Sequence, residues 1–423
     1  MENCKLPKDL VVDILARLSV KSLMQFKCVC KFFYDLITSD RHFLDKHYGI
    51  SKAKTDYVLL ETGWNVREYY LLYKESEGNE IECIYLDIPV RPKAQRWVKS
   101  CEGMLCLILT RKDVLNLDAG DNLIYDILIW NPFIRKIKAL PPITVPYKLS
   151  YPAYALNAFG FGISNNMIWK VVMRLEICSL CDDGRKIVHQ TTMVYSQVHG
   201  DSWSLRPINL VTSFLDREIQ GDGFYLKGRY YWSEKSYFNG QYLLWFDMDD
   251  KVFGTIEFPS DVTIASVTIM DETIALLGYP SVGDFSCIGI WLMIENDNNT
   301  YWRKQTIVDC VVNADNNECW RPIGIWNAGT ELLVFLDSTI AWDPFSDEMD
   351  VPYFISIDLV TQERKMFSIS KERKCITMTS DQAAGYIQVY NERNTNIAEE
   401  WKQSIFMRKR IYARVYSESL HLL

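Results

Sequence analysis

Near the end of its first third the chain reads Ile129-Trp130-Asn131-Pro132-Phe133-Ile134-Arg135-Lys136-Ile137, and Leu140-Pro141 closes the stretch. Two apolar runs joined by a turn that asparagine opens are typical of a β-hairpin, because an Asn or Asp side chain can accept hydrogen bonds from the backbone of its own turn. The pattern returns in residues 244–259, with Asp247 at the turn, and in residues 355–367, with Asp358. The sequence therefore predicts three similar hairpins.

Three further turns accompany these hairpins. Residues 193–203 and 290–302 also read as hairpins, and residues 75–79 form a polar turn between apolar runs. The six turn centres fall at residues 77, 131, 199, 248, 297 and 359, a mean spacing of about 56 residues. A period of about 50 residues with two hairpins per unit is typical of a kelch-type β-propeller. We expect a mainly β fold in which residues 51–423 form six to seven blades.

The composition agrees with a large β-rich core. Of the 423 residues, 48% are hydrophobic and 13% aromatic, which excludes disorder and favours pleated sheets. A pair of β-sandwiches is an alternative arrangement of the same strands. Recurrence of Trp and Tyr at matching hairpin positions favours the propeller.

Residues 1–50 differ from the rest because they read as helix. Leu10, Ile14 and Leu18 follow the 3.6-residue period, and Pro7 stands at a first-turn position, where its missing N–H costs nothing. The charge changes at the same boundary, from 8 − 6 = +2 in residues 1–50 to 38 − 48 = −10 in residues 51–423. We expect two domains, residues 1–50 and residues 51–423.

Three polar or small residues punctuate the helical part. Ser22 is expected to cap a second helix, Asp40 to cap a short helix over residues 41–48, and Gly49 to end that helix. About 40 residues cannot bury so many apolar side chains alone. The helices are therefore either a cap packed on the following domain or a docking module for another protein.

The order of residues 6–37 resembles an F-box. The similarity rests on Leu6-Pro7-Lys8-Asp9-Leu10-Val11-Val12-Asp13-Ile14-Leu15-Ala16-Arg17-Leu18, on Val20-Lys21-Ser22-Leu23, on Phe26-Lys27-Cys28-Val29-Cys30-Lys31 and on Leu36-Ile37. It implies a three-helix segment that binds the Skp adaptor of cullin-based ubiquitin ligases. Ser19 replaces the usual proline and Phe33 the usual tryptophan, and neither change is expected to abolish binding. The resemblance assigns adaptor contacts to Leu6, Pro7, Leu10, Ile14, Leu15, Leu18, Leu23, Phe26, Val29 and Phe33.

The remaining motifs are similar to the F-box-associated domain of plant F-box proteins. They are the hairpin at residues 129–141, Phe159-Gly160-Phe161-Gly162, the hairpins at residues 193–203 and 244–259, and the final residues 416–420. Their order looks most like the S-locus F-box group, whose substrates are S-ribonucleases in pollen. The resemblance implies a non-catalytic subunit of a Skp–cullin–RING ubiquitin ligase whose propeller captures a protein substrate. Residues 341–350 and the chain after Lys371 fit the pattern poorly.

Charge and hydropathy exclude several function classes. The formal net charge of −8 argues against sequence-independent nucleic-acid binding. No apolar run approaches a membrane span, and residues 1–10 lack the apolar core of a secretory signal. We expect a cytoplasmic protein, with a nuclear location left open, whose 12 cysteines are reduced.

Catalytic and cofactor motifs fail in detail. Gly160-Phe161-Gly162 lacks the third glycine of a dinucleotide loop, so we interpret it as a tight turn into a strand. Cys178 and Cys181 have no histidines at zinc-finger spacing, and Cys28, Cys30, Cys101 and Cys106 read as small core residues. His42 and His47 are expected to be solvated or capping. We expect that the protein binds no cofactor and no metal and has no enzymatic activity. The alternatives are a propeller enzyme with a helical cap and a scaffold without ubiquitin transfer.

Acidic residues gather in expected loops of the propeller. These charges either solvate the surface or meet a basic partner, and an S-ribonuclease is such a partner. Residues 343–350 hold four acids without Lys or Arg. The sequence therefore nominates Phe345, Asp347, Glu348 and Asp350 as substrate contacts.

Overall fold

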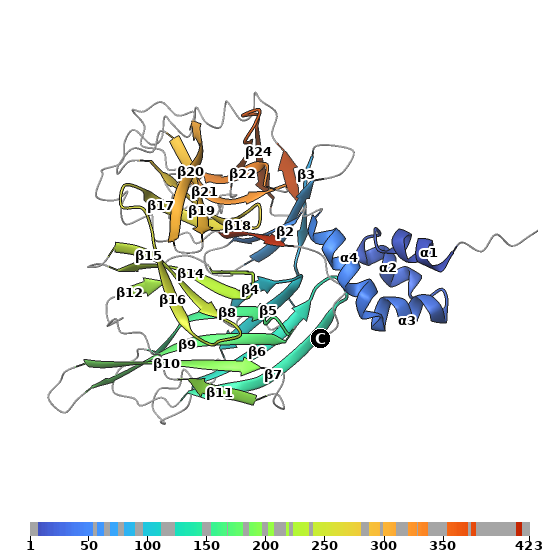
Figure 1. Cartoon of the computed structure of the whole chain (residues 1–423), viewed down its shortest axis with the longest axis horizontal. Helices are drawn as coiled ribbons and strands as arrows, with labels where there is room; N and C mark the ends of the chain where they lie inside the picture. The colour runs from blue at the N-terminus through green and yellow to red at the C-terminus, as the bar shows by residue number, and fades with distance from the viewer. Residues whose placement is uncertain are drawn as a thin grey trace, which may run out of the picture.

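A computed structural model provides the structure of the chain (Figure 1). It describes residues 7–53, 57–62, 68–74, 80–88, 96–110, 123–145, 154–166, 168–180, 186–196, 202–206, 217–219, 223–236, 240–280, 287–296, 299–309, 320–327, 329–336, 353–370, 374–377 and 412–416.

Four helices form the N-terminal part: α1 (Lys8–Leu15), α2 (Val20–Phe26), α3 (Lys31–Ser39) and α4 (Arg41–Ala53). Asp40 caps α4 as predicted, since its Oδ1 accepts from the N–H of Phe43 at 3.0 Å. The predicted cap at Ser22 is wrong. Ser19 has the extended backbone of a cap, and its Oγ accepts from the N–H of Ser22. The predicted end at Gly49 is also wrong, because α4 runs on to Ala53.

Six antiparallel sheets follow, and their strand orders are those of propeller blades. Blade 1 contains β26 (Tyr412–Tyr416), β1 (Tyr57–Thr62), β2 (Glu68–Lys74) and β3 (Ile81–Tyr85). Blade 2 contains β4 (Arg96–Cys101), β5 (Met104–Thr110), β6 (Leu123–Asn131) and β7 (Lys136–Val145). Blade 3 contains β8 (Tyr154–Ile163), β9 (Trp169–Leu180), β10 (Lys186–Ser196) and β11 (Ser202–Arg206).

Blade 4 contains β12 (Arg217–Ile219), β13 (Phe224–Leu226), β14 (Arg229–Ser236), β15 (Gly240–Asp247) and β16 (Phe253–Glu257); β12 and β13 both pair with β14. Blade 5 contains β17 (Thr263–Met270), β18 (Thr273–Tyr279), β19 (Cys287–Asn296) and β20 (Asn299–Asp309). Blade 6 contains β21 (Trp320–Trp326), β22 (Glu331–Leu336), β23 (Tyr353–Asp358), β24 (Arg364–Ile369) and β25 (Cys375–Thr377).

The mainly β propeller is thus confirmed with six blades, and the β-sandwich alternative is wrong. A sandwich would arrange its strands in two sheets packed face to face. Here the strands form six separate sheets, and the first strands of neighbouring blades, such as β21 and β26, lie side by side. The ring closes in blade 1, where β26 from the end of the chain pairs with β1 and Val58 faces Val415.

Three outer turns share one chemistry, as the hairpin pattern predicted. The side-chain oxygens of Asn131, Asp247 and Asp358 each accept two backbone N–H groups of their own turn. Four residues later each turn places a residue at positive φ: Arg135 at 55°, Lys251 at 57° and Gln362 at 61°. The side chain of the first residue in each turn therefore accepts hydrogen bonds from turn N–H groups that the pairing of the two strands leaves without a partner.

All of these turns lie at one end of the propeller. Successive antiparallel strands alternate in direction, so the turn between the first and second strands of a blade and the turn between its third and fourth strands share an end. We call this the turn end, and the opposite end the loop end.

Apolar clusters fill the spaces between neighbouring blades. Gly160 and Gly162 lie within β8, so the predicted tight turn is wrong. A Cβ at Gly160 would lie 2.6 Å from Cγ of Tyr230, and one at Gly162 would lie 2.6 Å from Cδ2 of Tyr225. Trp232 also donates its Nε1–H to the carbonyl of Phe159 at 3.0 Å. These glycines allow β8 to approach the aromatic side chains of blade 4.

Candidate functional site

The helical module buries part of its predicted contact set in its own core. Leu15 and Leu23 are 3% and 0% exposed, and they cluster with Val20, Leu36 and Phe43. A side chain enclosed in this way cannot reach a partner, so we correct the assignment of Leu15 and Leu23 from adaptor contacts to core residues.

Other predicted contacts lie on the outside of the module. Leu10 and Ile14 of α1 are 45% and 47% exposed, while Phe26 at the end of α2 and Val29 after it are 38% and 65% exposed. Pro7 is exposed, and Leu18 and Phe33 are half-buried. Leu6 lies outside the described residues.

The predicted set of adaptor contacts leaves out two members of this surface. Phe32 and Tyr34 of α3 are also exposed, at 38% and 50%. We call Leu10, Ile14, Phe26, Val29, Phe32 and Tyr34 the docking face. Among the described residues, six large exposed apolar side chains lie in the helical module and six in the much larger propeller, so the module carries the concentrated apolar surface.

Aromatic and cationic contacts join the helices across the docking face. The ring centroids of Phe26 and Phe33 are 6.0 Å apart, edge to face. Phe32 lies 5.7 Å from Phe33, and Nζ of Lys8 lies 5.3 Å above the Phe32 ring. Nζ of Lys27 lies 5.0 Å from the ring of Tyr34. Such a surface fits an apolar partner with acidic groups at its margin.

Several polar side chains lie where the sequence did not place them. His47, expected to be solvated or capping, is 2% exposed, and its Nε2 lies 3.0 Å from the carbonyl oxygen of Leu18. Cys28 and Cys30, expected in a core, are exposed. Cys101 and Cys106 are buried as predicted, and desolvation raises the pKa of the Cys106 thiol.

A propeller turn enters the core of the helical module. Ile134, in the β6–β7 turn, is 8% exposed and clusters with Leu15, Leu36 and Phe43. Phe133 of the same turn contacts this cluster and the cluster between blades 1 and 2, and its ring lies 5.7 Å from that of Tyr57. The helices are therefore held against the turn end.

The same turn position is polar or exposed in other blades. Two residues after Asn131, Asp247 and Asp358 stand Phe133, Asp249 and Val360; three residues after them stand Ile134, Asp250 and Thr361. Val360 is 85% exposed. Comparison of the three similar hairpins could have indicated this contact, because only the hairpin at Asn131 has two large apolar residues at these turn positions.

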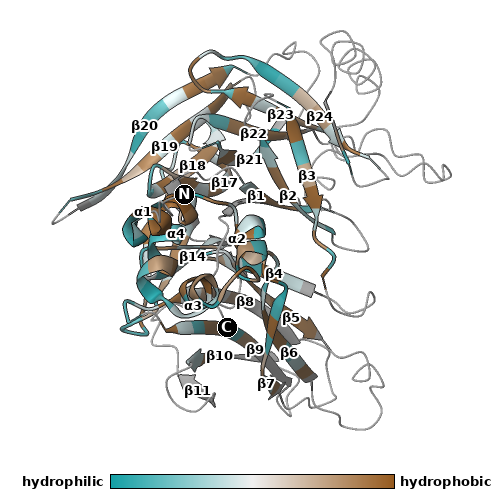
Figure 2. Cartoon of the chain, turned by 90° about the vertical axis from the view of Figure 1, so that its right-hand side faces the viewer, coloured by the Kyte–Doolittle hydropathy of each residue, from teal (hydrophilic) through white to brown (hydrophobic). Residues whose placement is uncertain are grey.

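The loop end lies away from the helices. In Figure 1 the helices are on the right, and the long strands β9 and β10 extend to the lower left. In Figure 2 the module faces the viewer with blades behind it. Phe345, Asp347, Glu348 and Asp350 lie outside the described residues; β22 ends before them and β23 begins after them at the loop end.

The described residues contain no group of three or more His, Cys, Asp or Glu side chains that could hold a metal ion. Among them, no helix is long and apolar enough to cross a membrane.

Comparisons with known proteins match both parts of the chain. A family model described as "F-box domain" matches residues 4–45, and one described as "F-box associated beta propeller domain" matches residues 82–337. An F-box/kelch-repeat protein of Arabidopsis thaliana is 23% identical over 68% of this chain and 70% of its own length. A putative F-box protein of the same plant is 26% identical over 59% of this chain, and the match spans 61% of that relative. Among solved structures, TolB from Acinetobacter baumannii aligns with 80% of this chain and 72% of its own, at 8% identity and a TM-score of 0.39.

Proposed function

Since the chain belongs to the family of F-box proteins that carry an F-box associated β-propeller domain, we propose that it is the substrate-recognition subunit of a Skp–cullin–F-box ubiquitin ligase. The helical module binds the Skp adaptor, and the propeller binds the protein to be ubiquitinated. The concentration of exposed apolar side chains on the docking face is the observation that supports this proposal most directly.

In this proposal the chain performs no bond chemistry itself. It raises the effective concentration of substrate lysines near the ubiquitin that a recruited enzyme carries. The burial of Ile134 among the helices supports such a role, because it holds the docking face in a defined position relative to the propeller. We propose that this activity takes place in the cytoplasm. The nucleus is a second candidate location.

For the substrate we propose a basic protein that contacts the loop end, and S-ribonucleases are the candidate class. Residues 51–423 have a charge of 38 − 48 = −10, which would speed encounter with a basic partner. Converting Asp347, Glu348 and Asp350 to Asn, Gln and Asn should slow association at low salt. Association rates that keep the same salt dependence after this change would exclude the loop as the contact.

The adaptor proposal is tested by co-purification of the full chain with the Skp adaptor and cullin. Replacing Ile14 and Val29 by Asp places two charges on the docking face and should abolish co-purification. Val360→Asp is the matched control, because Val360 is also apolar and exposed but lies on the propeller. Its binding should equal that of the native chain. Equal adaptor binding by the docking-face variant would contradict the proposal.

A further inference from the structure

The propeller ring is closed where its first and last blades meet, and we call this place the closure seam. β26 pairs with β1 on one side and lies next to β21 on the other. An apolar cluster of blades 1 and 6, including Leu60, Leu72, Phe335 and Phe354, fills the seam. Noncovalent contacts between residues far apart in the sequence therefore decide whether the ring stays closed.

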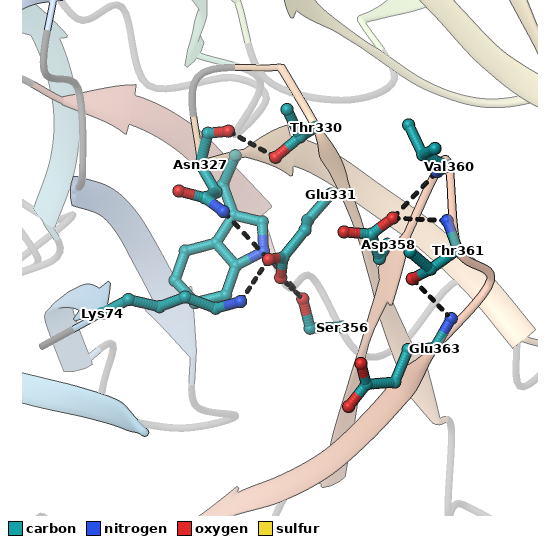
Figure 3. A network of polar contacts seen from close by, with 10 residues as sticks. Lys74, Asn327, Thr330, Glu331, Ser356, Asp358, Val360, Thr361 and Glu363 are labelled. Atoms are coloured by element: carbon teal, nitrogen blue, oxygen red, sulfur yellow. Dashed lines mark hydrogen bonds and ion pairs between the residues drawn. The ribbon is translucent and has the colours of Figure 1, made fainter. Parts of the chain in front are cut away.

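A buried ion pair adds to the seam (Figure 3). Lys74 of β2 is paired with Glu331 of β22, and their side chains are 14% and 7% exposed. Glu331 also accepts from Nδ2 of Asn327 at 2.9 Å and from Oγ of Ser356. The network ties the second strand of blade 6 to the third of blade 1.

Two cysteines meet at the outer edge of the same seam. Cys83 lies on β3 of blade 1 and Cys375 on β25 of blade 6, and these outermost strands are neighbours. The side chain and backbone N–H of Cys375 both hydrogen-bond to the Cys83 sulfur. Both thiols are partly exposed and border the seam cluster beside Tyr85. Two thiols that are 375 − 83 = 292 residues apart in the sequence thus lie on neighbouring strands, within reach of a hydrogen bond, and both are partly exposed to solvent.

The Cys83 thiol differs in its pKa from the buried Cys106 thiol. The hydrogen bonds from Cys375 lower the pKa of the Cys83 thiol and outweigh the opposing effect of burial. The thiolate is the form that reacts with peroxides and disulfides. Cys106 is enclosed, and its thiol pKa is raised, so it is protected from the same reagents.

We propose that Cys83 and Cys375 form a reversible disulfide that covalently staples the first blade to the last under oxidising conditions. With hydrogen peroxide, the Cys83 thiolate attacks one oxygen, breaks the O–O bond and forms a sulfenic acid with release of water after proton transfer. The Cys375 thiol then attacks that sulfur, forms the S–S bond and releases a second water. The two thiols lose two electrons and two protons, and one peroxide is reduced to two waters. A thiol reductant reverses the step.

The disulfide would oppose opening of the propeller ring. A cross-link between residues so far apart restricts the unfolded chain, and it prevents blades 1 and 6 from separating. Propeller stability would then rise when the surroundings become oxidising, whereas the docking face on the helices would be unchanged.

The experiment treats the full chain with hydrogen peroxide and compares it before and after reduction. Peptide mapping without reductant should find the Cys83 peptide linked to the Cys375 peptide. The melting temperature should rise by about 5 °C and return after reduction. In Cys83→Ser and in Cys375→Ser, both the linked peptide and the rise should be lost. Circular dichroism under reducing conditions checks that these variants fold.

Cys28→Ser is the matched control, because Cys28 is also a thiol of the chain but lies exposed on the helical module. It should keep both the linked peptide and the rise. Linkage of other cysteine pairs in place of Cys83 and Cys375, or a rise that persists in Cys83→Ser, would overturn the proposal. Neither readout uses the Skp adaptor, so the outcome is independent of the ligase proposal.

Discussion

Ile134, in a turn of the second propeller blade, is buried in the same apolar cluster as Phe43 of helix α4. The two side chains belong to parts of the chain that the sequence separates into two domains. Their burial in one cluster means that the helical module and the propeller share a core, and that the docking face has a defined position relative to the turn end.

The first prediction concerns this shared core. Replacing Phe133 and Ile134 by Asp gives the turn the residues that Asp249 and Asp250 provide in blade 4, so the hairpin itself should survive. The helices should detach, because two charges cannot stay in an apolar core. Adaptor binding should persist, while substrate ubiquitination falls by about tenfold as the effective concentration drops. Small-angle scattering should show a larger radius of gyration.

Val360→Asp is the control for this prediction, since Val360 occupies the position of Phe133 in blade 6 and is exposed. Its scattering curve and ubiquitination rate should match those of the native chain. An unchanged radius of gyration in the double variant, Phe133→Asp with Ile134→Asp, would show that the helices do not depend on this turn.

The second prediction concerns the turn at Asp358. Hydrogen bonds from the backbone N–H groups of Thr361 and Val360, at 2.7 and 2.9 Å, lower the pKa of the Asp358 carboxyl. Asp358→Ala removes Oδ1, the oxygen that accepts both hydrogen bonds, and should lower the free energy of unfolding by about 1 kcal/mol at pH 7. Asp358→Asn keeps an oxygen that can accept both hydrogen bonds and loses only the negative charge, so it should cost less.

The pH dependence of this effect has a defined sign. A carboxyl with a lowered folded pKa stabilises above its unfolded pKa of about 3.9, and that contribution is lost as pH falls through the folded pKa. The stability difference between the native chain and Asp358→Asn should therefore narrow below about pH 4. Melting temperatures between pH 7 and pH 3 measure it, and a difference that stays constant would contradict the role of the charge.

The third prediction uses one substitution at two glycines. Gly160→Ala would place a Cβ 2.6 Å from Cγ of Tyr230 and 2.9 Å from Cζ2 of Trp232, and both rings are buried. Overpacking of this kind should destabilise by about 1–3 kcal/mol. Gly49→Ala lies within α4 with no atom within 4 Å, and it should stabilise by up to about 1 kcal/mol through helix propensity. Denaturant unfolding measures the change in the free energy of unfolding for both variants. If both variants changed stability in the same direction, the packing argument would be wrong.

The fourth prediction concerns the ion pair of the closure seam. Lys74→Met leaves Glu331 buried without its cation and should destabilise by about 3 kcal/mol or more. Adding Glu331→Gln should recover part of this loss, because it removes the uncompensated charge. Lys227→Met breaks the exposed contact with Glu272, 66% and 72% exposed, and should cost less than about 1 kcal/mol. If both lysine variants lose the same stability in denaturant unfolding, burial of the Lys74 pair is not decisive.

Local features of the sequence were sufficient for the helices and for the repeated hairpins. The 3.6-residue period located the helical module, and the side chains at Asn131, Asp247 and Asp358 located three outer turns, because both depend on residues only a few positions apart. Tight turns at Glu102-Gly103, Lys227-Gly228 and Asp271-Glu272, all at positive φ, carried a similar local signal that was not used.

The number of blades did not follow from the spacing of turns. The spacing between turns includes the connections between strands, and these differ in length from blade to blade. The mean spacing was therefore compatible with either six or seven blades. Pairing of Val58 with Val415 closes the ring at six, and this contact joins opposite ends of the chain. The interpretation of Gly160 failed for a related reason: the aromatic rings that require a glycine there come from another blade.

Within the helical module, the order of residues was enough to identify the apolar side chains and the family that they resemble. Packing in three dimensions was needed to show that Leu15 and Leu23 form the core while Leu10 and Ile14 remain outside it. The same packing brings Ile134 into that core from another domain. Apolar character belongs to a residue, and helical periodicity follows from its near neighbours. Burial depends on which distant segments pack against it, and that is settled when the whole chain has folded.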